Sequence, residues 1–256
     1  MHKTSTHHPL SANINVRMRE APVLRMLDLR RGEQCLDVGC GLGYMLEQLK
    51  DAGAELHGID VSAESIDYVK ERVTPHATVG SCLDIPYPNN MFNKVLFCEV
   101  IEHLEDDEKA LQEIRRVLKP GGRLVVSTPA LEGVFSTSPL KRLGHHHGGE
   151  HHARDGYYSK ELQNLLQANG YRVVETRLCM FLFSELLMEL TKIVFLLKQK
   201  TFSAQSDILK TEQSFSYRAL RRAIALLLPL FSLEDRFWIP LTKKGHALII
   251  SAEKLP

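Results

Sequence analysis

The sequence predicts a doubly wound α/β fold around a mostly parallel, seven-stranded sheet, and three observations support this prediction. Short apolar runs typical of buried strands alternate with segments of helical periodicity, which is the pattern of parallel βαβ units. A glycine-rich turn joins the first predicted strand to its helix, and the next two strands are followed by carboxylates. At 256 residues, 44% apolar and 25% charged, the chain is long enough for one domain with an insertion.

The glycine-rich turn follows the predicted strand QCLDV at 34–38 and contains Gly39, Gly41 and Gly43 at alternate positions. Glycine permits a sharp turn and a close approach of the main chain to a ligand. Apolar residues with helical spacing then predict a helix that opens inside the glycine stretch, and its first amides favour a carboxylate. Tyr44 stands where a dinucleotide fingerprint needs its third glycine, which argues against a nicotinamide cofactor.

Two carboxylates follow the second and third predicted strands. ELHGID at 55–60 ends in Asp60, and Ser62 is placed to cap the helix after it. An acidic residue about 20 residues beyond the glycines can accept hydrogen bonds from both hydroxyls of a ribose. ATVG at 77–80 is the third strand, and Asp84 just beyond it can accept a hydrogen bond from an exocyclic amine such as that of adenine. Either aspartate alone is typical of a solvated loop, but the ordered set indicates a pocket for a nucleoside with an amino-acid tail.

The remaining elements are predicted from periodicity and turn residues. In chain order they are a helix over about 14–29, a strand KVLFC, a helix over 106–119, a turn KPGG at 119–122, a strand over 123–129, a long loop over 130–159, a helix that stops at Gly170, and strands over 171–178 and 246–253.

At these motifs the chain resembles the class I S-adenosylmethionine-dependent methyltransferases. The matching stretches are LDVGCGLG, GIDVS, CLDIPYPNNMFNKVLFCEVIEHL and LKPGGRLVVSTP, from about Val16 to Thr128, with looser similarity to Arg177. The motifs are most similar to those of quinone-biosynthesis O-methyltransferases and their lipid- and glycan-modifying relatives. The resemblance implies a Rossmann-like fold, S-adenosyl-L-methionine as cofactor, and methylation, expected on oxygen, of a small or amphipathic acceptor such as a lipid, a quinone or a lipid-linked glycan.

The resemblance also implies which residues bind the cofactor. Gly39 to Gly43 would hold the methionine portion, Asp60 the ribose and Asp84 the adenine amine, while Cys98 would lie near the sulfonium. The full expected set is Asp37, Gly39, Cys40, Gly41, Gly43, Asp60, Val61, Cys82, Leu83, Asp84 and Cys98.

The segment EVIEHL at 99–104 is expected to face the acceptor, because ligands of α/β proteins bind at the carboxyl ends of the strands. His103 is the candidate general base, since imidazole exchanges protons near neutral pH. Its alternative role is a hydrogen bond to the start of a helix. In some quinone enzymes the equivalents of Glu99, Glu102 and His103 are assigned to a metal ion, but the Glu-His pair is widespread without one, and we expect no metal here.

The loop before the predicted helix that stops at Gly170 contains further candidates. Its pattern HHARDGYYS resembles a stretch of many such methyltransferases in which the equivalents of His152, Arg154 and Tyr157 line the acceptor side. Histidines 145–147 and 151–152 lack helical spacing and an accompanying cysteine. We expect these histidines to contact water or substrate rather than a metal ion.

The expected domain organisation is a disordered stretch over 1–12, a methyltransferase domain over 13–178 and 245–256, and a helical insertion over 179–244. Glu185, Glu189 and Lys192 within 180–198 argue against a membrane-spanning helix, and Pro229 is expected to interrupt the apolar run after the arginines at 218–222. The insertion has two interpretations, a helical cap or homodimer interface and a membrane-surface contact through 180–232.

Charge and composition exclude one class of acceptor. Residues 1–180 carry 21 basic and 24 acidic side chains with no basic stripe, so no nucleic-acid partner is expected. The chain has five cysteines without a C-x-x-C pair and no apolar signal core at the start. These features predict a cytoplasmic location, and the insertion adds the prediction of peripheral binding to the inner face of the membrane. The alternative function is a membrane-surface or oligomeric subunit that binds the cofactor without transferring a methyl group.

Overall fold

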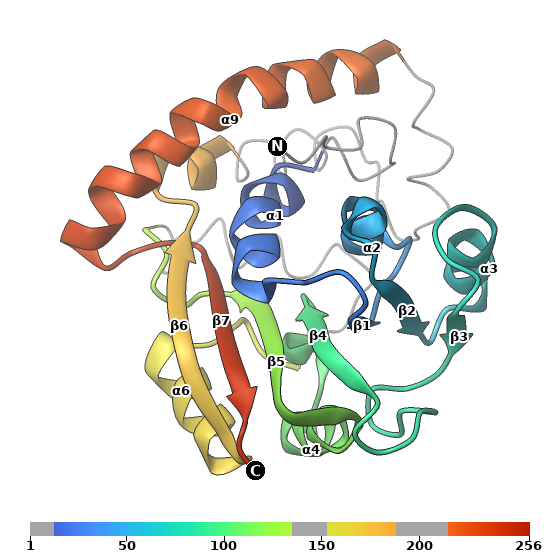
Figure 1. The fold of residues 1–256 in the computed structure, drawn as a ribbon. Coiled ribbons are helices and arrows are strands. Elements are labelled where there is room, and N and C mark those ends of the chain that lie inside the picture. The colour runs from blue at the N-terminus through green and yellow to red at the C-terminus, as the bar shows by residue number, and fades with distance from the viewer. Residues whose placement is uncertain (1–12, 135–152, 188–214) are drawn as a thin grey trace.

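The computed structural model describes residues 13–134, 153–187 and 215–256. A seven-stranded sheet forms its centre, with the order β3-β2-β1-β4-β5-β7-β6 (Figure 1). Only β7 is antiparallel to its neighbours β5 and β6, so the predicted doubly wound, mostly parallel sheet is confirmed. The strands are β1 Gln34–Val38, β2 Glu55–Asp60, β3 Ala77–Val79, β4 Phe92–Cys98, β5 Leu118–Pro129, β6 Tyr171–Cys179 and β7 Ala247–Lys254.

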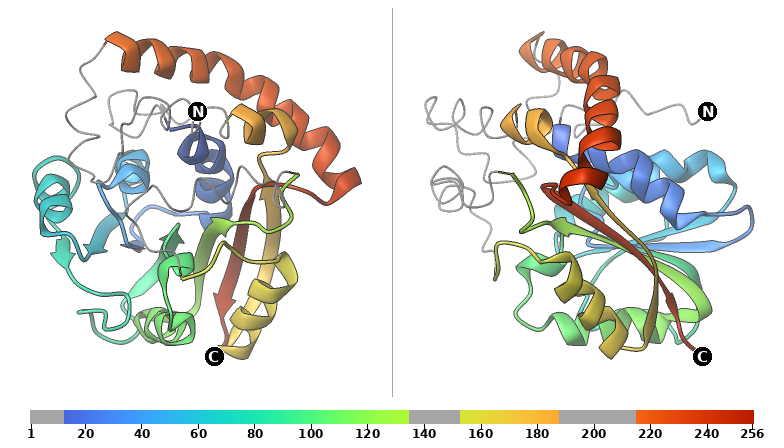
Figure 2. Two further views of the ribbon diagram at one scale, coloured as in Figure 1. Left: turned by 180° about the vertical axis from the view of Figure 1, so that it is seen from behind. Right: turned by 90° about the vertical axis from the view of Figure 1, so that its left-hand side faces the viewer.

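Helices cover both faces of this sheet (Figure 2). Each has local sequence reasons for its position: Ser62 caps α3, whereas α4 begins with acidic side chains behind the cap Asp106 and ends with Arg115 and Arg116. The helical elements are α1 Ile14–Leu27, α2 Tyr44–Leu49, η2 Lys50–Ala52, α3 Ala63–Arg72, η3 Ile101–His103, α4 Asp107–Val117, α6 Ser159–Ala168 and α9 Phe215–Thr242.

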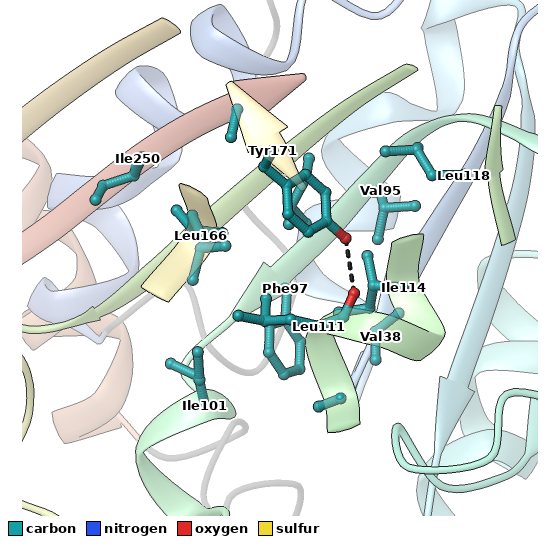
Figure 3. Packing of buried hydrophobic residues seen from close by; sticks show 14 of the residues in the cluster. Val38, Val95, Phe97, Ile101, Leu111, Ile114, Leu118, Leu166, Tyr171 and Ile250 are labelled. Carbon is teal, nitrogen blue, oxygen red and sulfur yellow. Dashed lines mark hydrogen bonds between the residues drawn. The ribbon is translucent and has the colours of Figure 1, made fainter. Parts of the chain in front are cut away.

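Alternate residues of the central strands supply two separate cores. In β5, Leu124 and Val126 pack with α4 and α6, while Val125 packs on the opposite face with α1, α2 and α3. This is the side-chain period of a strand buried on both faces. In the first core the Tyr171 hydroxyl donates a hydrogen bond of 2.8 Å to the Leu111 carbonyl, which ties β6 to α4 (Figure 3).

Two local predictions were wrong. The KPGG segment is not a turn before β5 but an irregular part of that strand. Phe92 of β4 pairs with Leu118 of β5, and the next pair is Lys94 with Arg123, so the extra residues of β5 between these two pairs form a bulge. Gly121, with a φ of 71°, makes this bulge possible. Pro229 does not interrupt α9, which is continuous through it. Pro229 is exposed, so water can satisfy the backbone carbonyl that the proline leaves without a partner.

The insertion between β6 and β7 is tied to the sheet by two carboxylates of α9. Asp235 accepts hydrogen bonds of 2.9 Å from the backbone amides of Met180 and Phe181, and Glu234 accepts one of 2.9 Å from Phe183. These amides lead into a short helical segment over 182–187, whose first donors have no partner within the helix. In the described part of the chain, no helix has the length and apolar character needed to cross a membrane.

We predict that Asp235→Ala lowers the free energy of unfolding by about 2–4 kcal/mol, because two buried amides lose their acceptor. Burial raises the pKa of Asp235 to about 6, so denaturant titration near pH 8 tests the ionised form. Ser232→Ala, at an exposed position of the same helix, is the matched control and should change stability by less than about 0.5 kcal/mol. Equal stability of the two variants would contradict the anchoring role.

Candidate functional site at the carboxyl edge of the sheet

The glycine turn after β1 is hydrogen-bonded directly to β2. The amides of Gly39 and Cys40 both donate to the Ile59 carbonyl, at 2.8 and 2.9 Å. Beside them, the Asp60 carboxylate accepts one hydrogen bond from the Gly41 amide at 2.8 Å and one from the Ser62 amide at 2.9 Å. Each carboxylate oxygen keeps a further lone pair, so Asp60 can still accept hydrogen bonds from two ribose hydroxyls.

Gly39 occupies a position that no other residue can take without a local shift. Its φ is 74°, and a β-carbon placed on it would lie 2.3 Å from Cγ2 of Val100, which follows β4. Gly41 and Gly43 also have positive φ angles, of 49° and 75°. α2 begins at Tyr44, directly after the glycines rather than among them. The turn therefore brings main chain close to the end of β4.

Asp37, the last but one residue of β1, is a buried carboxyl group behind this turn. Burial and the nearby Asp60 carboxylate raise its pKa to about 7. Two thiols are affected by burial and by the same Asp37 carboxylate. Together these raise the pKa of Cys40, and they raise the pKa of Cys98 to about 12. Both thiols are therefore neutral, and a cationic ligand group near Asp37 would favour its ionised form.

The segment after β3 lies next to Asp60. The Gly80 amide donates to the Asp60 carbonyl at 3.0 Å, and the Asp84 amide donates back to the Ser81 carbonyl at 3.2 Å, which closes a tight turn. Cys82 and Leu83 are half-buried within this turn and pack against the first core. Asp84 and Val61 are exposed. The predicted cofactor residues after β1, β2, β3 and β4 thus lie along one edge of the sheet.

The end of β4 contains an ion pair between a buried arginine and a half-buried glutamate, which the sequence did not predict. Glu99 has a φ of 58°, rare for a residue other than glycine, and its Oε1 accepts a hydrogen bond of 3.2 Å from the Ser127 hydroxyl. The guanidinium of Arg19, buried in α1, pairs with the same carboxylate. One signal for Arg19 existed in the sequence, since it falls on the apolar face of α1 that includes Val23 and Met26.

The two other residues considered for a metal, Glu102 and His103, lie in η3, just after Glu99. Glu102 is buried, burial raises the pKa of its carboxyl group, and its Oε2 accepts a hydrogen bond of 3.2 Å from Thr128. His103 is half-buried at the end of η3, where its amide donates to the Val100 carbonyl at 3.0 Å. Across the residues that the structure describes, no three His, Cys, Asp or Glu side chains form a group that could hold a metal ion.

Two residues of the segment before α6 that the resemblance places on the acceptor side, Arg154 and Tyr157, contact the start of α4. Tyr157 is fully buried, and its hydroxyl donates a hydrogen bond of 2.7 Å to Oδ2 of Asp107. Arg154 pairs with the same oxygen at 3.0 Å and lies over the Tyr157 ring. Both side chains hold this segment on the start of α4. His152 and the histidines at 145–147 and 151 lie outside the described residues.

Comparison with known proteins agrees with this geometry. A family model for a methyltransferase domain matches residues 36–126. YdaC of Bacillus subtilis, an uncharacterized methyltransferase, is 31% identical over 126 residues, which cover 47% of this chain and 70% of YdaC. A demethylmenaquinone methyltransferase of Corynebacterium kroppenstedtii is 34% identical over 135 residues, which cover 52% of this chain and 58% of that protein.

The fold and the sheet edge therefore define an enzyme of the Rossmann-like methyltransferase class. The chain belongs to the class I S-adenosylmethionine-dependent methyltransferases. The solved structure of Haemonchus contortus phosphoethanolamine N-methyltransferase 2 with S-adenosyl-L-methionine shares the fold at 17% identity, with a TM-score of 0.59, over 93% of this chain and 52% of that one. The chain spans only 48% and 50% of the length of two other curated relatives.

We predict that Gly39→Ala lowers the affinity for S-adenosylhomocysteine at least tenfold in titration calorimetry, because the added methyl group displaces the turn or Val100. Gly32→Ala is the matched control, since Gly32 has a φ of 80° but open space around its β-carbon. Both variants pay about 1 kcal/mol of backbone strain, and only Gly39→Ala should lose binding.

The contact with Val100 can be tested by a second change. Val100→Ala removes the two methyl groups and leaves only its Cβ, 3.5 Å from the new side chain. The double variant should therefore regain part of the affinity. If Gly39→Ala binds S-adenosylhomocysteine as tightly as the wild type, and Val100→Ala changes nothing, the close approach of the turn to β4 is contradicted.

Proposed function

We propose that this methyltransferase acts on an oxygen of a small or amphipathic acceptor, in the class of lipids, quinones and lipid-linked glycans. The observation that carries the proposal is the position of the apolar insertion. α9 lies on the side of the sheet at which β4 and β6 end, the same edge as the glycine turn (Figure 1). Together with 182–187 it forms an apolar groove of about 770 Å³. The similarity to a demethylmenaquinone methyltransferase supports the same class of acceptor.

In this proposal the residues of the sheet edge hold the cofactor. The glycine turn and Asp37 bind the methionine portion, with the Asp37 carboxylate next to its ammonium group. Asp60 binds the ribose, Asp84 binds the adenine amine, and Val61, Cys82 and Leu83 contact the adenosine. The domain would consist of 13–178 and 245–256, with 179–244 as a helical cap.

The chemistry requires orientation and the exclusion of water more than covalent catalysis. S-adenosyl-L-methionine supplies an electrophilic methyl group on a sulfonium. Cys98, neutral and half-buried at the end of β4, would border the reacting groups without competing as a thiolate nucleophile. His103 would take the proton from an acceptor hydroxyl, and the Glu99–Arg19 pair would hold the β4 end in the conformation that presents His103.

The first test identifies the acceptor. Lipid and glycan extracts incubated with the enzyme and S-adenosyl-L-methionine should contain a species heavier by one methylene group in mass spectrometry. The species should be missing with Asp60→Asn, which keeps the shape of the side chain but not its charge. Methylation confined to water-soluble polar metabolites would overturn the proposed acceptor class.

The affinity for S-adenosylhomocysteine should rise by about eightfold between about pH 6 and about pH 7.5, as the fraction of ionised Asp37 increases. The direction of this change in affinity follows from the pKa of Asp37, which is about 7 in the free protein. A ligand ammonium group favours the carboxylate, so binding below this pKa must release a proton. Titration calorimetry in two buffers of different ionisation enthalpy measures both effects. Asp37→Asn should bind more weakly with no such slope, and a flat profile for the wild type would exclude this contact.

His103→Gln should lower kcat by about 10²–10⁴-fold for an acceptor with a weakly acidic hydroxyl, because the general base is lost. The affinity for S-adenosylhomocysteine should stay unchanged. His76→Gln, a change at an exposed histidine just before β3, is the control. An equal loss of activity with an acceptor that is already ionised would show that His103 acts in another way.

A further inference from the structure

The insertion presents an unusually apolar outer surface. We use the term α9 face for the exposed apolar side chains of α9 and of the helical segment over 182–187. Leu226 and Leu241 are 78% and 77% exposed. The other members are also exposed, and most of them line the apolar groove. The α9 face consists of Phe183, Leu186, Leu226, Leu230, Leu233, Phe237, Trp238 and Leu241.

The exposed charges of residues 222–244, which belong to α9 and its end, have one sign. Between residues 222 and 244 the acidic side chains are Glu234 and Asp235, and both are buried with their oxygens on backbone amides. The basic side chains of the same stretch are all exposed, so every exposed charge of residues 222–244 is cationic. They are Arg222, Arg236, Lys243 and Lys244.

The apolar and cationic residues are ordered around the helix. At about 100° per residue, the leucines of the α9 face and Phe237 fall within an arc of about 80°. Arg222 and Arg236 fall along one margin of this arc, while Ile224, Phe231 and Asp235 face the sheet and are buried. A narrow apolar stripe with arginines at its margin is the pattern of a helix that lies in a membrane interface.

We propose that the α9 face binds the surface of a bilayer that contains anionic phospholipids, with α9 in the plane of the interface. The apolar side chains enter the boundary of the acyl chains, and the four cations contact the headgroups. Charge complementarity favours a lipid surface over a second copy of the chain, because a symmetric dimer through this face would bring the same cations together.

Because of the position of α9, binding to a bilayer would also affect which acceptors can reach the cofactor edge. α9 lies at the edge where the parallel strands end, so binding to a bilayer would bring the cofactor edge near molecules that are anchored in it. This consequence rests on the proposed function, because it assumes an amphipathic acceptor. The docking itself depends only on the α9 face and its cations.

The test is sedimentation of the full chain with vesicles of phosphatidylcholine, with and without phosphatidylglycerol. The wild type should bind the anionic vesicles, and binding should weaken with salt. Leu226→Gln with Leu241→Gln should reduce binding at least tenfold, since two leucines no longer enter the bilayer. Arg222→Gln with Arg236→Gln should reduce binding by about fivefold per removed charge.

Matched controls lie on another surface of the molecule. Val174→Gln and Lys160→Gln change an exposed apolar and an exposed basic residue of β6 and α6, and neither should affect vesicle binding. All variants should bind S-adenosylhomocysteine as the wild type does, which shows that they are folded. No binding of the wild type to anionic vesicles, or equal binding of the α9 and control variants, would overturn the proposal.

Two further results separate this proposal from its alternatives. If Leu226→Gln with Leu241→Gln converts a dimer to a monomer in analytical ultracentrifugation, the α9 face is an interface between two copies and the proposal is overturned. If vesicle binding fails while methyl transfer to an amphipathic acceptor persists, only the docking is wrong. If vesicle binding follows the expectations but only water-soluble polar metabolites are methylated, the docking stands and the proposed acceptor class is wrong.

Discussion

The Asp60 carboxylate is the interaction on which the candidate site depends. It accepts the Gly41 amide from the turn after β1 and the Ser62 amide from the start of α3. One side chain therefore sets the distance between the two loops that would enclose the cofactor. It is also the side chain proposed to bind the ribose. Charge-assisted hydrogen bonds from backbone amides fix such a carboxylate strongly, so the two loops are held in place without a ligand.

Buried charge shapes the neighbouring strand ends. Asp37 lies behind the glycine turn with a pKa near neutrality, while Glu99 is paired with the buried Arg19 at the end of β4. Removing one partner of such a pair leaves an uncompensated charge, which costs several kcal/mol. This cost explains how Glu99 can keep its left-handed backbone. The η3 turn that carries His103 follows directly from that constrained position.

The insertion between β6 and β7 differs in how its charged side chains are arranged. Its carboxylates Glu234 and Asp235 are directed inward, where they satisfy amides that would otherwise be buried without an acceptor. This arrangement leaves exposed apolar side chains on α9 and only cations among the exposed charges of residues 222–244. Exposed apolar surfaces of this kind are typical of interaction sites, which is the basis of the proposed docking to a bilayer.

The sequence by itself determined the order and type of the elements and the position of the glycine turn. These follow from local rules of periodicity, capping and glycine conformation, as at Ser62 and Gly39. It did not determine that KPGG is a bulge within β5 or that Tyr157 is buried against Asp107. Nor did it show that Arg19 meets Glu99. Those outcomes depend on groups distant along the chain that only packing brings together, and burial then decides which charges pair and which backbone strain is kept.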